Sequence, residues 1–452
     1  MKEEKLNAPL KVGVISLGCD KNRVDTENMM TYLRNSGKYT FVSDPSEADI
    51  IIINTCAFIQ SARSESKDTI REMCDYRTKG NCKCLVVTGC YPQKYIKDLT
   101  VNFKEVDIFL GTNEYQNLVQ ILDDFFNGNN AEQIVKTNSP YCLEAVEQGR
   151  LVSTPSYTAY IKIADGCDNF CSYCTIPYIR GRFRSRKMES IISEAKDLVA
   201  NGARELILVA QDTAKYGYDL YGESKLHELI QKLSKIKGLV WIRLLYCYPE
   251  NITDALIEEM KNNKLVCKYI DVPFQHVSNK ILKAMNRHVT KDEILNITHK
   301  LTENVKGIAI RSTFIVGFPG ETKQDFNELL DFVKTEKLPN VGFFTYSRED
   351  GTVAARLPEQ VDEITKRRRL IKASKTQKKV ITEYNKSLVG ETLKVILEGF
   401  DEKKGLFFGR SEYQAPDIDT LIYFSADTDL TVGEFYDVTI VKVKGYDLYG
   451  VI

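Results

Sequence analysis

The chain has 452 residues, more than one hydrophobic core usually holds, so two or three domains are expected. Hydrophobic residues make up 43% of it and charged residues 27%, the proportions of a soluble globular protein. The 62 basic and 62 acidic side chains cancel, so overall charge indicates neither a nucleic-acid nor a membrane partner.

The first residues, Met1–Asn7, contain no apolar segment, so a secretory signal is not expected. The longest aliphatic run, Ile50–Ile53, is far too short to cross a bilayer. Twelve cysteines in a chain without a signal indicate reduced thiols and metal binding rather than disulfides. We therefore predict a cytoplasmic protein with no membrane partner.

Three apolar runs in the first hundred residues are strand-like, and a cysteine follows each of them within three residues. The runs are Val12–Leu17, Asp49–Ile53 and Leu85–Val87, and the cysteines are Cys19, Cys56 and Cys90. Helix-like segments, Val24–Arg34 and Gln60–Cys74, separate the runs, which predicts a parallel, Rossmann-like α/β sheet. Ligands collect beyond the carboxyl ends of such strands, so the three cysteines are expected to converge there. Three unrelated buried thiols are the alternative.

Cys82 and Cys84 are rival metal ligands, because a C-x-C pair also suits a metal. They precede the third strand, and Cys84 to Cys90 spans roughly 20 Å if extended at about 3.3 Å per residue. Cys84 is therefore expected at the opposite edge of the sheet, and Cys90 is favoured. The cysteines without partner spacing are expected to be ordinary packed thiols: Cys74, Cys142, Cys247 and Cys267.

A C-x3-C-x2-C pattern follows the strand-like Ala159–Ala164 and consists of Cys167, Cys171 and Cys174. Three thiolates on one loop can hold three corners of an iron–sulfur cube. No fourth cysteine stands at close spacing, so one iron would keep an open, reactive position. The alternatives are a zinc knuckle completed by a distant residue, or three core cysteines.

From Tyr157 the pattern alternates between strand and helix. The strand-like runs are Ala159–Ile163, Glu205–Ala210, Val240–Tyr246, Tyr269–Val272, Ala309–Val316 and Val341–Tyr346. The helix-like runs are Glu189–Ala200, Lys225–Ile236, Asp254–Lys261, Asp292–Glu303 and Lys323–Lys334. Six β/α units predict an open partial (β/α)6 barrel, whose loops at the carboxyl ends of the strands carry the chemistry.

Those loops are polar. Gly317–Glu321 allows backbone to approach a ligand such as a nucleoside, although it also suits a simple turn before the next helix. His276 is either a ligand-binding or a hydrogen-bonded structural histidine. The basic segment Arg180–Lys187 either neutralises a cluster, faces an acidic substrate or is solvated surface.

The C-terminal region begins with a long basic helix, Glu363–Lys386. Residues 362–386 contain nine basic and three acidic side chains, a balance of +6. Five short strands then predict a small antiparallel β-barrel: Leu393–Leu397, Gly405–Gly409, Thr420–Phe424, Phe435–Val443 and Tyr446–Val451. Residues 387–452 contain six basic and twelve acidic side chains, a balance of −6. An acidic barrel favours a basic partner such as a ribosomal protein, unless the domain only packs against the rest.

From about Lys11 to Ile452 the chain resembles the methylthiotransferase family of the radical S-adenosylmethionine superfamily. The stretches that carry the resemblance are Leu17–Asp25, Asn54–Ile59, Pro273–His276, Gly317–Thr322 and Tyr446–Gly450. They are similar to the branch that adds a methylthio group to the β-carbon of an aspartate in the small-subunit ribosomal protein S-twelve. The other branch modifies a tRNA adenosine. Asp20 departs from the proline that many relatives have.

The resemblance implies three domains and a linker: an N-terminal methylthiotransferase domain (9–130), the linker (131–155), a radical S-adenosylmethionine domain (156–386) and a TRAM domain (387–452). It implies two 4Fe-4S clusters, a reactive one on Cys167, Cys171 and Cys174 and an auxiliary one on Cys19, Cys56 and Cys90. It also implies that S-adenosylmethionine binds the open iron, with Gln211, Gly317 and Glu321 as contacts to the nucleoside.

The partners implied are ribosomal protein S-twelve, free or in the ribosome, and an electron donor such as a flavodoxin or ferredoxin; the chain is expected to be a monomer. Two other functions stay open. A tRNA methylthiotransferase is favoured by the basic helix and the TRAM-like barrel. A non-catalytic metal-binding or RNA-binding protein would keep the cysteines for structure alone.

Overall fold

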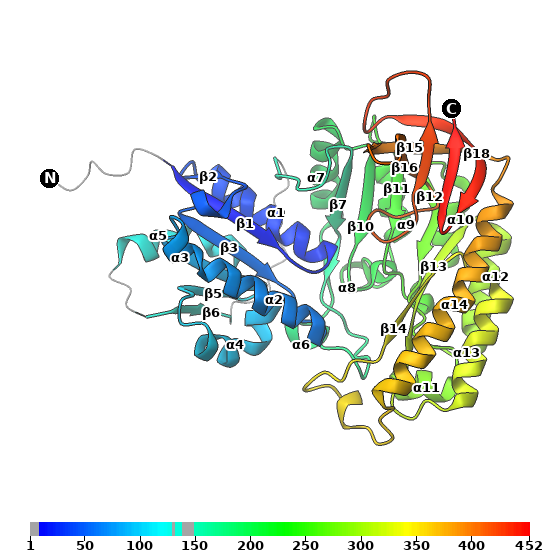
Figure 1. Ribbon diagram of the computed structural model, residues 1–452, viewed down its shortest axis with the longest axis horizontal. Coiled ribbons are helices and arrows are strands. Elements are labelled where there is room, and N and C mark those ends of the chain that lie inside the picture. Colours follow the sequence, from blue (N-terminus) through cyan, green and yellow to red (C-terminus); the bar gives the residue numbers. More distant parts are fainter. Residues whose placement is uncertain (1–8, 129–131, 138–148) are drawn as a thin grey trace. The chain divides into compact units, whose positions relative to one another are not determined.

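The computed structural model describes residues 9–128, 132–137 and 149–452 (Figure 1). The predictions for Met1–Asn7, for Cys142 and for part of the segment 131–155 lie outside these residues. The chain divides into two compact units. Unit 1 contains the described residues up to Ser153, together with Tyr160–Asp168 and Cys174–Leu198; unit 2 contains Thr154–Ala159, Asn169–Tyr173 and Val199–Ile452.

Unit 1 is built on a six-stranded parallel sheet with the order β2-β1-β3-β4-β5-β6. Its strands are β1 (Leu10–Ser16), β2 (Tyr39–Phe41), β3 (Ile50–Thr55), β4 (Cys84–Gly89), β5 (Ile108–Leu110) and β6 (Ile134–Lys136). Its helices are α1 (Asp20–Asn35), α2 (Gln60–Cys74), α3 (Tyr76–Lys79), α4 (Cys90–Asn102) and α5 (Leu118–Asn127). The predicted Rossmann-like sheet is confirmed.

The two central strands of this sheet explain its clear sequence signal. Every residue of β3 and β4 is buried, because helices cover both faces of a parallel sheet. Both strands therefore read as continuous apolar runs. By contrast β2, β5 and β6 have only three residues each and were not predicted. The last of them lies inside the segment expected to be a linker.

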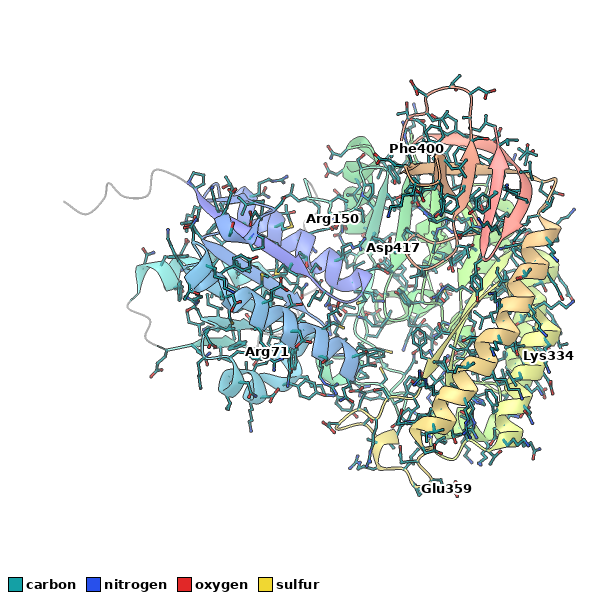
Figure 2. All side chains as sticks on the ribbon, in the orientation of Figure 1. Arg71, Arg150, Lys334, Glu359, Phe400 and Asp417 are labelled. Carbon is teal, nitrogen blue, oxygen red and sulfur yellow. The ribbon has the colours of Figure 1, made fainter. Side chains whose placement is uncertain are left out.

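Unit 1 also contains most of β7 (Thr158–Lys162) and the elements that follow it. These are β8 (Ala164–Asp165), α6 (Ile176–Arg180), β9 (Arg184–Ser185) and most of α7 (Met188–Ala200). A buried arginine links α7 to the first helix: Arg150, labelled in Figure 2, pairs with Glu194 at 2.7 Å and faces Glu27 at 3.6 Å. Arg186 pairs with the same Glu194 at 2.5 Å. Paired and buried charges of this kind fix one arrangement of the helices within the unit.

Unit 2 contains a parallel sheet in the order β14-β13-β12-β11-β10, and the start of β7 follows β10 at its edge. Its strands are β10 (Glu205–Val209), β11 (Trp241–Leu244), β12 (Val266–Asp271), β13 (Ala309–Val316) and β14 (Asn340–Thr345). Its first six helices are α8 (Tyr218–Tyr221), α9 (Leu226–Leu233), α10 (Asp254–Asn262), α11 (Asn279–Ala284), α12 (Lys291–Asn304) and α13 (Lys323–Glu336). The predicted strand–helix alternation is confirmed; the short α8 and α11 were not predicted.

The long helix α14 (Glu363–Ser387) packs against β14 and α13 and leads into a closed five-stranded barrel (Figure 1). The barrel strands are β15 (Thr392–Asp401), β16 (Leu406–Ser411), β17 (Ile422–Ser425), β18 (Phe435–Lys444) and β19 (Asp447–Val451). All pairings are antiparallel, as predicted, except that β17 and β19 pair in parallel. Closure removes the exposed strand edges that a small sheet would otherwise leave.

A buried carboxylate joins the barrel to the sheet of unit 2. Glu205, on β10, accepts hydrogen bonds from Arg243 on β11 and from Arg410 on β16, both at 2.7 Å. Burial raises the pKa of Glu205, but the two guanidinium groups outweigh burial and lower it to about 2. Trp241 packs edge-on against Phe435 beside this network. The barrel is therefore anchored by ionic and aromatic contacts that no sequence pattern indicated.

Within the described ranges, no helix combines the length and the apolar character that crossing a bilayer requires.

Candidate metal centres

The cysteines that follow β1, β3 and β4 lie together in unit 1. These strands are neighbours in the sheet, in the order β1-β3-β4. Cys19 precedes the first residue of α1, Cys56 comes directly after β3, and Cys90 opens α4. The three thiols are close enough for each of the other two to raise the pKa of Cys90. The sheet topology therefore brings together residues that are far apart in the sequence.

Close packing of the first two cysteine loops depends on a glycine. Gly18 has a φ of +90°, and a Cβ atom there would lie 2.7 Å from the Cβ of Cys56. Any other residue would therefore strain the backbone and push the Cys19 loop away from Cys56.

Asn22, in the first turn of α1, ties these loops to one another. Its fully buried side chain donates to the carbonyl oxygens of Leu17 and Thr55, each at 3.1 Å. Its Oδ1 accepts from Arg180 at 2.5 Å and lies 3.7 Å from the Sγ of Cys90. One amide group thus fixes the backbone before Cys19 and before Cys56 and contacts the sulfur of Cys90.

Arg180 is a charged group in contact with one of these thiols. It ends α6, is 2% exposed, and its Nη2 lies 3.7 Å from the Sγ of Cys90. The guanidinium group partly offsets the effect of burial, which raises the pKa of Cys90 to about 12. Burial also raises the pKa of Cys56. These thiols keep their protons until something that favours the thiolate, such as a metal, replaces them.

Behind Arg180 lies a buried ionic network. Its Nη1 pairs with Asp25 at 2.8 Å and with Asp165 at 3.1 Å. Lys162 pairs with the same two carboxylates. Two positive and two negative charges cancel here. Of the three readings of the basic segment, solvated surface is wrong for Arg180 and Arg186, which are both buried.

The structure separates the rival thiols from this group. Cys84 starts β4 and is paired with Ile50 at the amino edge of the sheet, as predicted. Cys82 lies next to it and donates to the carbonyl oxygen of Cys84 at 3.4 Å. Cys247 and Cys267 are fully buried, and burial raises the pKa of both. These thiols have the properties of packed side chains.

The second triad lies on the loop that follows β8, and the loop contributes to both units. In unit 1, the backbone N–H of Cys167 donates to the carbonyl oxygen of Gly181 at 3.1 Å. The backbone N–H of Ile176 donates to the Sγ of Cys174 at 3.4 Å, at the start of α6. A backbone donor aimed at sulfur favours the thiolate form that binds a metal.

In unit 2, Cys171 is 4% exposed and lies against two polar side chains. Its Sγ is 3.8 Å from the hydroxyl of Tyr248 and 3.9 Å from Nη1 of Arg287. The guanidinium group of Arg287 stacks 4.1 Å from the centre of the Tyr248 ring and donates to the carbonyl oxygen of Pro273. In the part of the chain that the structure describes, no carboxylate lies within ion-pair distance of Arg287, and its Nε has no hydrogen-bond partner. A buried positive charge therefore faces this cysteine.

The unit 2 part of the loop is held by hydrogen bonds from residues 284–286. The backbone N–H of Ser172 donates to the carbonyl oxygen of Met285 at 2.9 Å, and its hydroxyl donates to that of Ala284 at 2.8 Å. Asn286 donates to the carbonyl oxygens of Asn169 and Phe170. The end of α11 and the segment that follows it thus carry both the anchors of this loop and Arg287.

Asp212 supports the same loop from the carboxyl end of β10. It is fully buried and accepts from Asn251 at 2.7 Å, from Asn169 at 3.4 Å and from the backbone N–H of Tyr248 at 3.4 Å. Burial, with a smaller effect of Glu250, raises its pKa to about 6. Asp212 therefore links two neighbouring loops of the candidate site.

The residues expected to contact a nucleoside have different surroundings. Gln211 lies half-buried just after β10. Glu321 already accepts from the backbone N–H of Gly317 at 2.5 Å and from Arg369 at 2.9 Å, and burial raises its pKa to about 7. Gly317 has a φ of +74°, and a Cβ there would collide with Lys366. The last two residues thus shape a tight turn.

His276 is fully buried and accepts from the backbone N–H of Ser278 at 3.0 Å. Burial lowers its pKa to about 3. Its surroundings favour the structural histidine over the ligand-binding one.

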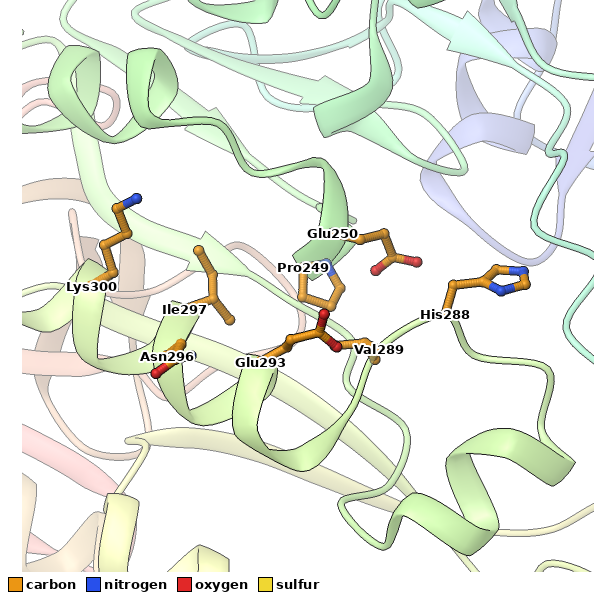
Figure 3. A pocket seen from close by; sticks show the side chains of 8 residues that line it. All are labelled: Pro249, Glu250, His288, Val289, Glu293, Asn296, Ile297 and Lys300. Atoms are coloured by element: carbon orange, nitrogen blue, oxygen red, sulfur yellow. The ribbon is translucent and has the colours of Figure 1, made fainter.

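A pocket of about 310 Å³ opens on the residues that follow Tyr248 and Arg287 in the chain (Figure 3). Its polar lining consists of Glu250, His288, Glu293, Asn296 and Lys300. Its position places ligand-sized space in unit 2 beside the segments that hold Cys171.

Among the described residues, no group of three or more His, Cys, Asp or Glu side chains surrounds a single ion position. An iron–sulfur cluster spaces its ligands more widely than a single ion does, because each thiolate binds a different iron. The donor sets fit such a group chemically: each triad consists of thiols only, and a buried arginine lies within 4 Å of one sulfur in each. Sequence patterns identified the six cysteines but not Asn22, Arg180 as a contact of Cys90, or Arg287.

Three family descriptions match the chain. Residues 161–333 match the radical SAM superfamily, residues 11–111 match the uncharacterized protein family UPF0004, and residues 389–452 match the TRAM domain.

Relatives match over almost the whole chain. A protein of Clostridium perfringens named ribosomal protein uS12 methylthiotransferase RimO is 50% identical over 446 residues, 98% of each chain. Proteins of the same name from Desulforamulus reducens and Clostridium botulinum are 47% identical over 97% of this chain and 46% identical over 98% of it, in each case covering 98% of the relative.

Among solved structures, the radical S-adenosylmethionine methyltransferase TsrM from Kitasatospora setae, with cobalamin and a [4Fe-4S] cluster bound, has a TM-score of 0.55. It is 14% identical and 75% of each chain is covered. The cobalamin-dependent S-adenosylmethionine radical enzyme OxsB has a TM-score of 0.53 at 13% identity and covers 82% of this chain and 56% of its own. At these identities the likeness supports the fold alone.

Proposed function

This chain belongs to the RimO family of radical S-adenosylmethionine methylthiotransferases, and on that premise we propose that it adds a methylthio group to ribosomal protein uS12. The acceptor is the β-carbon of an aspartate. The observation that carries the proposal is the identity of 46–50% over nearly the full length with relatives of that name. The two groups of thiols supply the donor atoms that such chemistry requires.

The reaction needs more than acid, base or nucleophile. An aspartate β-carbon has no leaving group, and its C–H bond is strong. When bound, a cluster held by Cys167, Cys171 and Cys174 supplies the electron that cleaves S-adenosylmethionine and so makes hydrogen removal possible, and a second cluster held by Cys19, Cys56 and Cys90 supplies a site for sulfur.

The chain's own residues prepare the first site. The guanidinium group of Arg287 contacts the sulfur of Cys171, and Tyr248 holds that group in place by stacking on it. Ser172 and Asn286 fix the loop backbone, and Asp212 holds the neighbouring loop. Glu321 keeps the turn at Gly317 closed, so we assign Gly317 and Glu321 to shaping the nucleoside pocket and Gln211 to contacting the nucleoside.

At the second site, Asn22 and Arg180 hold the cysteine loops in position. Asn22 bonds the backbone before Cys19 and before Cys56, and Arg180 reaches Cys90. The neutral network behind Arg180 keeps its guanidinium group oriented without adding net charge. Cys19 is the exposed member of the triad, so access from solvent is on its side.

We further propose the domain limits given above, a cytoplasmic monomer and an electron donor of the flavodoxin or ferredoxin type. Reduced thiols and a ribosomal substrate support the location.

Mass spectrometry of ribosomal proteins and tRNA from a deletion strain tests the function. We expect uS12 to lose the mass of one methylthio group, with tRNA unchanged. Loss from tRNA alone would overturn the proposal, and no loss from either would favour a non-catalytic protein.

Iron content tests the second cluster. Anaerobic reconstitution should give about eight irons per chain, and about four after Cys19, Cys56 and Cys90 are all changed to alanine. A native chain that holds only about four irons would contradict the assignment.

A further inference from the structure

The proposed chemistry leaves the outer face of the long basic helix α14 without a role. The helix has a clear inner face: Lys366, Ala373, Gln377, Val380 and Ile381 are buried against the rest of unit 2. The opposite face carries five exposed cations, which we call the basic stripe: Arg368, Lys372, Lys375, Lys379 and Lys386.

The basic stripe is straight. Its members are separated by four, three, four and seven residues, steps that return to the same side of a helix. At about 1.5 Å per residue, the stripe is about 27 Å long. It is therefore a line of charge rather than a compact patch.

Of the four other cations of α14, Arg367 is exposed, and the remaining three have partners within unit 2. Lys366 pairs with Glu363 at 2.7 Å, Arg369 pairs with Glu321 at 2.9 Å, and Lys378 lies over the ring of Tyr446. Between residues 149 and 452, and in the other described ranges, no carboxylate lies within ion-pair distance of any member of the stripe. Lys372 also lies 5.8 Å from the centre of the Phe326 ring, a contact that supplies no negative counter-charge. Five charges on one line therefore remain available to a partner.

From this arrangement we infer that the basic stripe binds the phosphate backbone of RNA in the small ribosomal subunit. A linear polyanion matches a line of cations, because each phosphate that a cation neutralises releases a condensed counterion. The acidic barrel follows α14 directly and belongs to the same unit, with a balance of −6 against +6 for residues 362–386. That barrel would repel an acidic protein partner. A basic ribosomal protein bound to RNA, by contrast, offers positive charge to the acidic barrel and negative phosphates to the basic stripe.

The choice of ribosomal RNA depends on the proposed function, whereas RNA binding by the stripe does not. Binding of ribosomal RNA by the stripe makes assembled ribosomal subunits, rather than free uS12, the preferred form of the substrate.

The test compares two variants with equal changes in charge. One replaces all five members of the stripe with glutamine. The control replaces five exposed lysines elsewhere in unit 2: Lys232, Lys235, Lys237, Lys261 and Lys264. Unfolding temperature and iron content identify any variant that fails to fold.

Binding to purified small ribosomal subunits and to their protein-free RNA is measured between 50 and 200 mM salt. Neutralising five phosphates should weaken the native enzyme by about 100-fold or more over this range. The stripe variant should lose most of that dependence, with a slope of log K against log salt flatter by about 3.5–4.5, and the control should keep it. The ratio of activity on subunits to activity on an isolated uS12 peptide should fall about tenfold for the stripe variant alone.

Equal RNA binding and equal slopes for the stripe variant and the native enzyme would overturn the inference. So would loss of binding to an acidic electron donor protein with RNA binding unchanged. If native enzyme modifies uS12 in no form while RNA binding still depends on the stripe, the proposed function fails and the RNA surface stands.

Discussion

The two cysteine triads differ in how they are assembled. Cys167, Cys171 and Cys174 occupy eight consecutive residues of one loop, so their proximity follows from the covalent chain. Cys19, Cys56 and Cys90 spread over 72 residues and meet because three parallel strands end at one edge of a sheet. A local site needs only its loop to be anchored, whereas a dispersed site needs the whole sheet and a cross-link such as Asn22.

The triads also differ in how charge is balanced. Asp25 and Asp165 together compensate the charges of Lys162 and of Arg180, which lies beside Cys90. In unit 2, among the residues that the structure describes, Arg287 beside Cys171 has no carboxylate at ion-pair distance. The first arginine therefore serves mainly to orient, and the second presents a full charge to its site.

Removing a ligand from the local triad should have the largest effect. Cys171→Ala takes one of three thiolates from the reactive site, so S-adenosylmethionine cleavage should fall by at least about 1000-fold. Chromatography of the cleavage products measures this loss. Cys267→Ala, a buried thiol outside both triads, is the matched control and should cleave normally; cleavage by Cys171→Ala at a comparable rate would refute its assignment.

Removing a ligand from the dispersed triad should separate the two activities. In Cys56→Ala, cleavage of S-adenosylmethionine should stay within about threefold of native, because the local triad is intact, while methylthio transfer should fall at least about 100-fold. Mass spectrometry of a uS12 peptide measures transfer. Normal methylthio product from this variant would show that the auxiliary assignment is wrong.

The charge difference can be tested by replacing each arginine with methionine. Arg287→Met removes an uncompensated buried charge, so the reduction potential of the cluster at the local triad should fall by on the order of 100 mV. Redox titration followed by electron paramagnetic resonance measures the potential. Arg287→Lys keeps the charge and should recover much of the shift, and Arg180→Met should leave this cluster unchanged. An unchanged potential in Arg287→Met would mean that the charge is screened.

The smallest expected effect is on the free energy of unfolding, through Asp212 beside the local triad. The pKa of Asp212 is raised to about 6 in the folded chain, so the folded state holds its proton more tightly than the unfolded state. Its contribution to stability is therefore greatest below about pH 4 and is lost as pH rises to about 6, by up to about 3 kcal/mol. Asp212→Asn should flatten this part of the pH dependence in denaturant unfolding of the metal-free chain. Identical pH profiles would place the raised pKa in doubt.

Much of the architecture could be predicted from the sequence. Central strands such as β3 and β4 are buried on both faces and read as continuous apolar runs, and the longer helices show clear periodicity. The three-residue strands β2, β5 and β6 carry too few residues for any pattern, and only pairing with neighbours defines them. The parallel pairing of β17 with β19 was not predicted for a similar reason, because the relative direction of two paired strands depends on how the barrel closes.

The sequence by itself indicated the side chains that we propose as metal ligands, because thiol chemistry and the placement of cysteines after strands can be read along the chain. It also determined the charge balance of α14 and of the barrel. Only the tertiary structure decided which arginines face the sulfurs, that Glu205 joins the barrel to the sheet, and which cations of α14 stay unpaired. The physical reason is range: spacing and composition act along the chain, whereas burial and ion pairing depend on residues that folding brings from elsewhere.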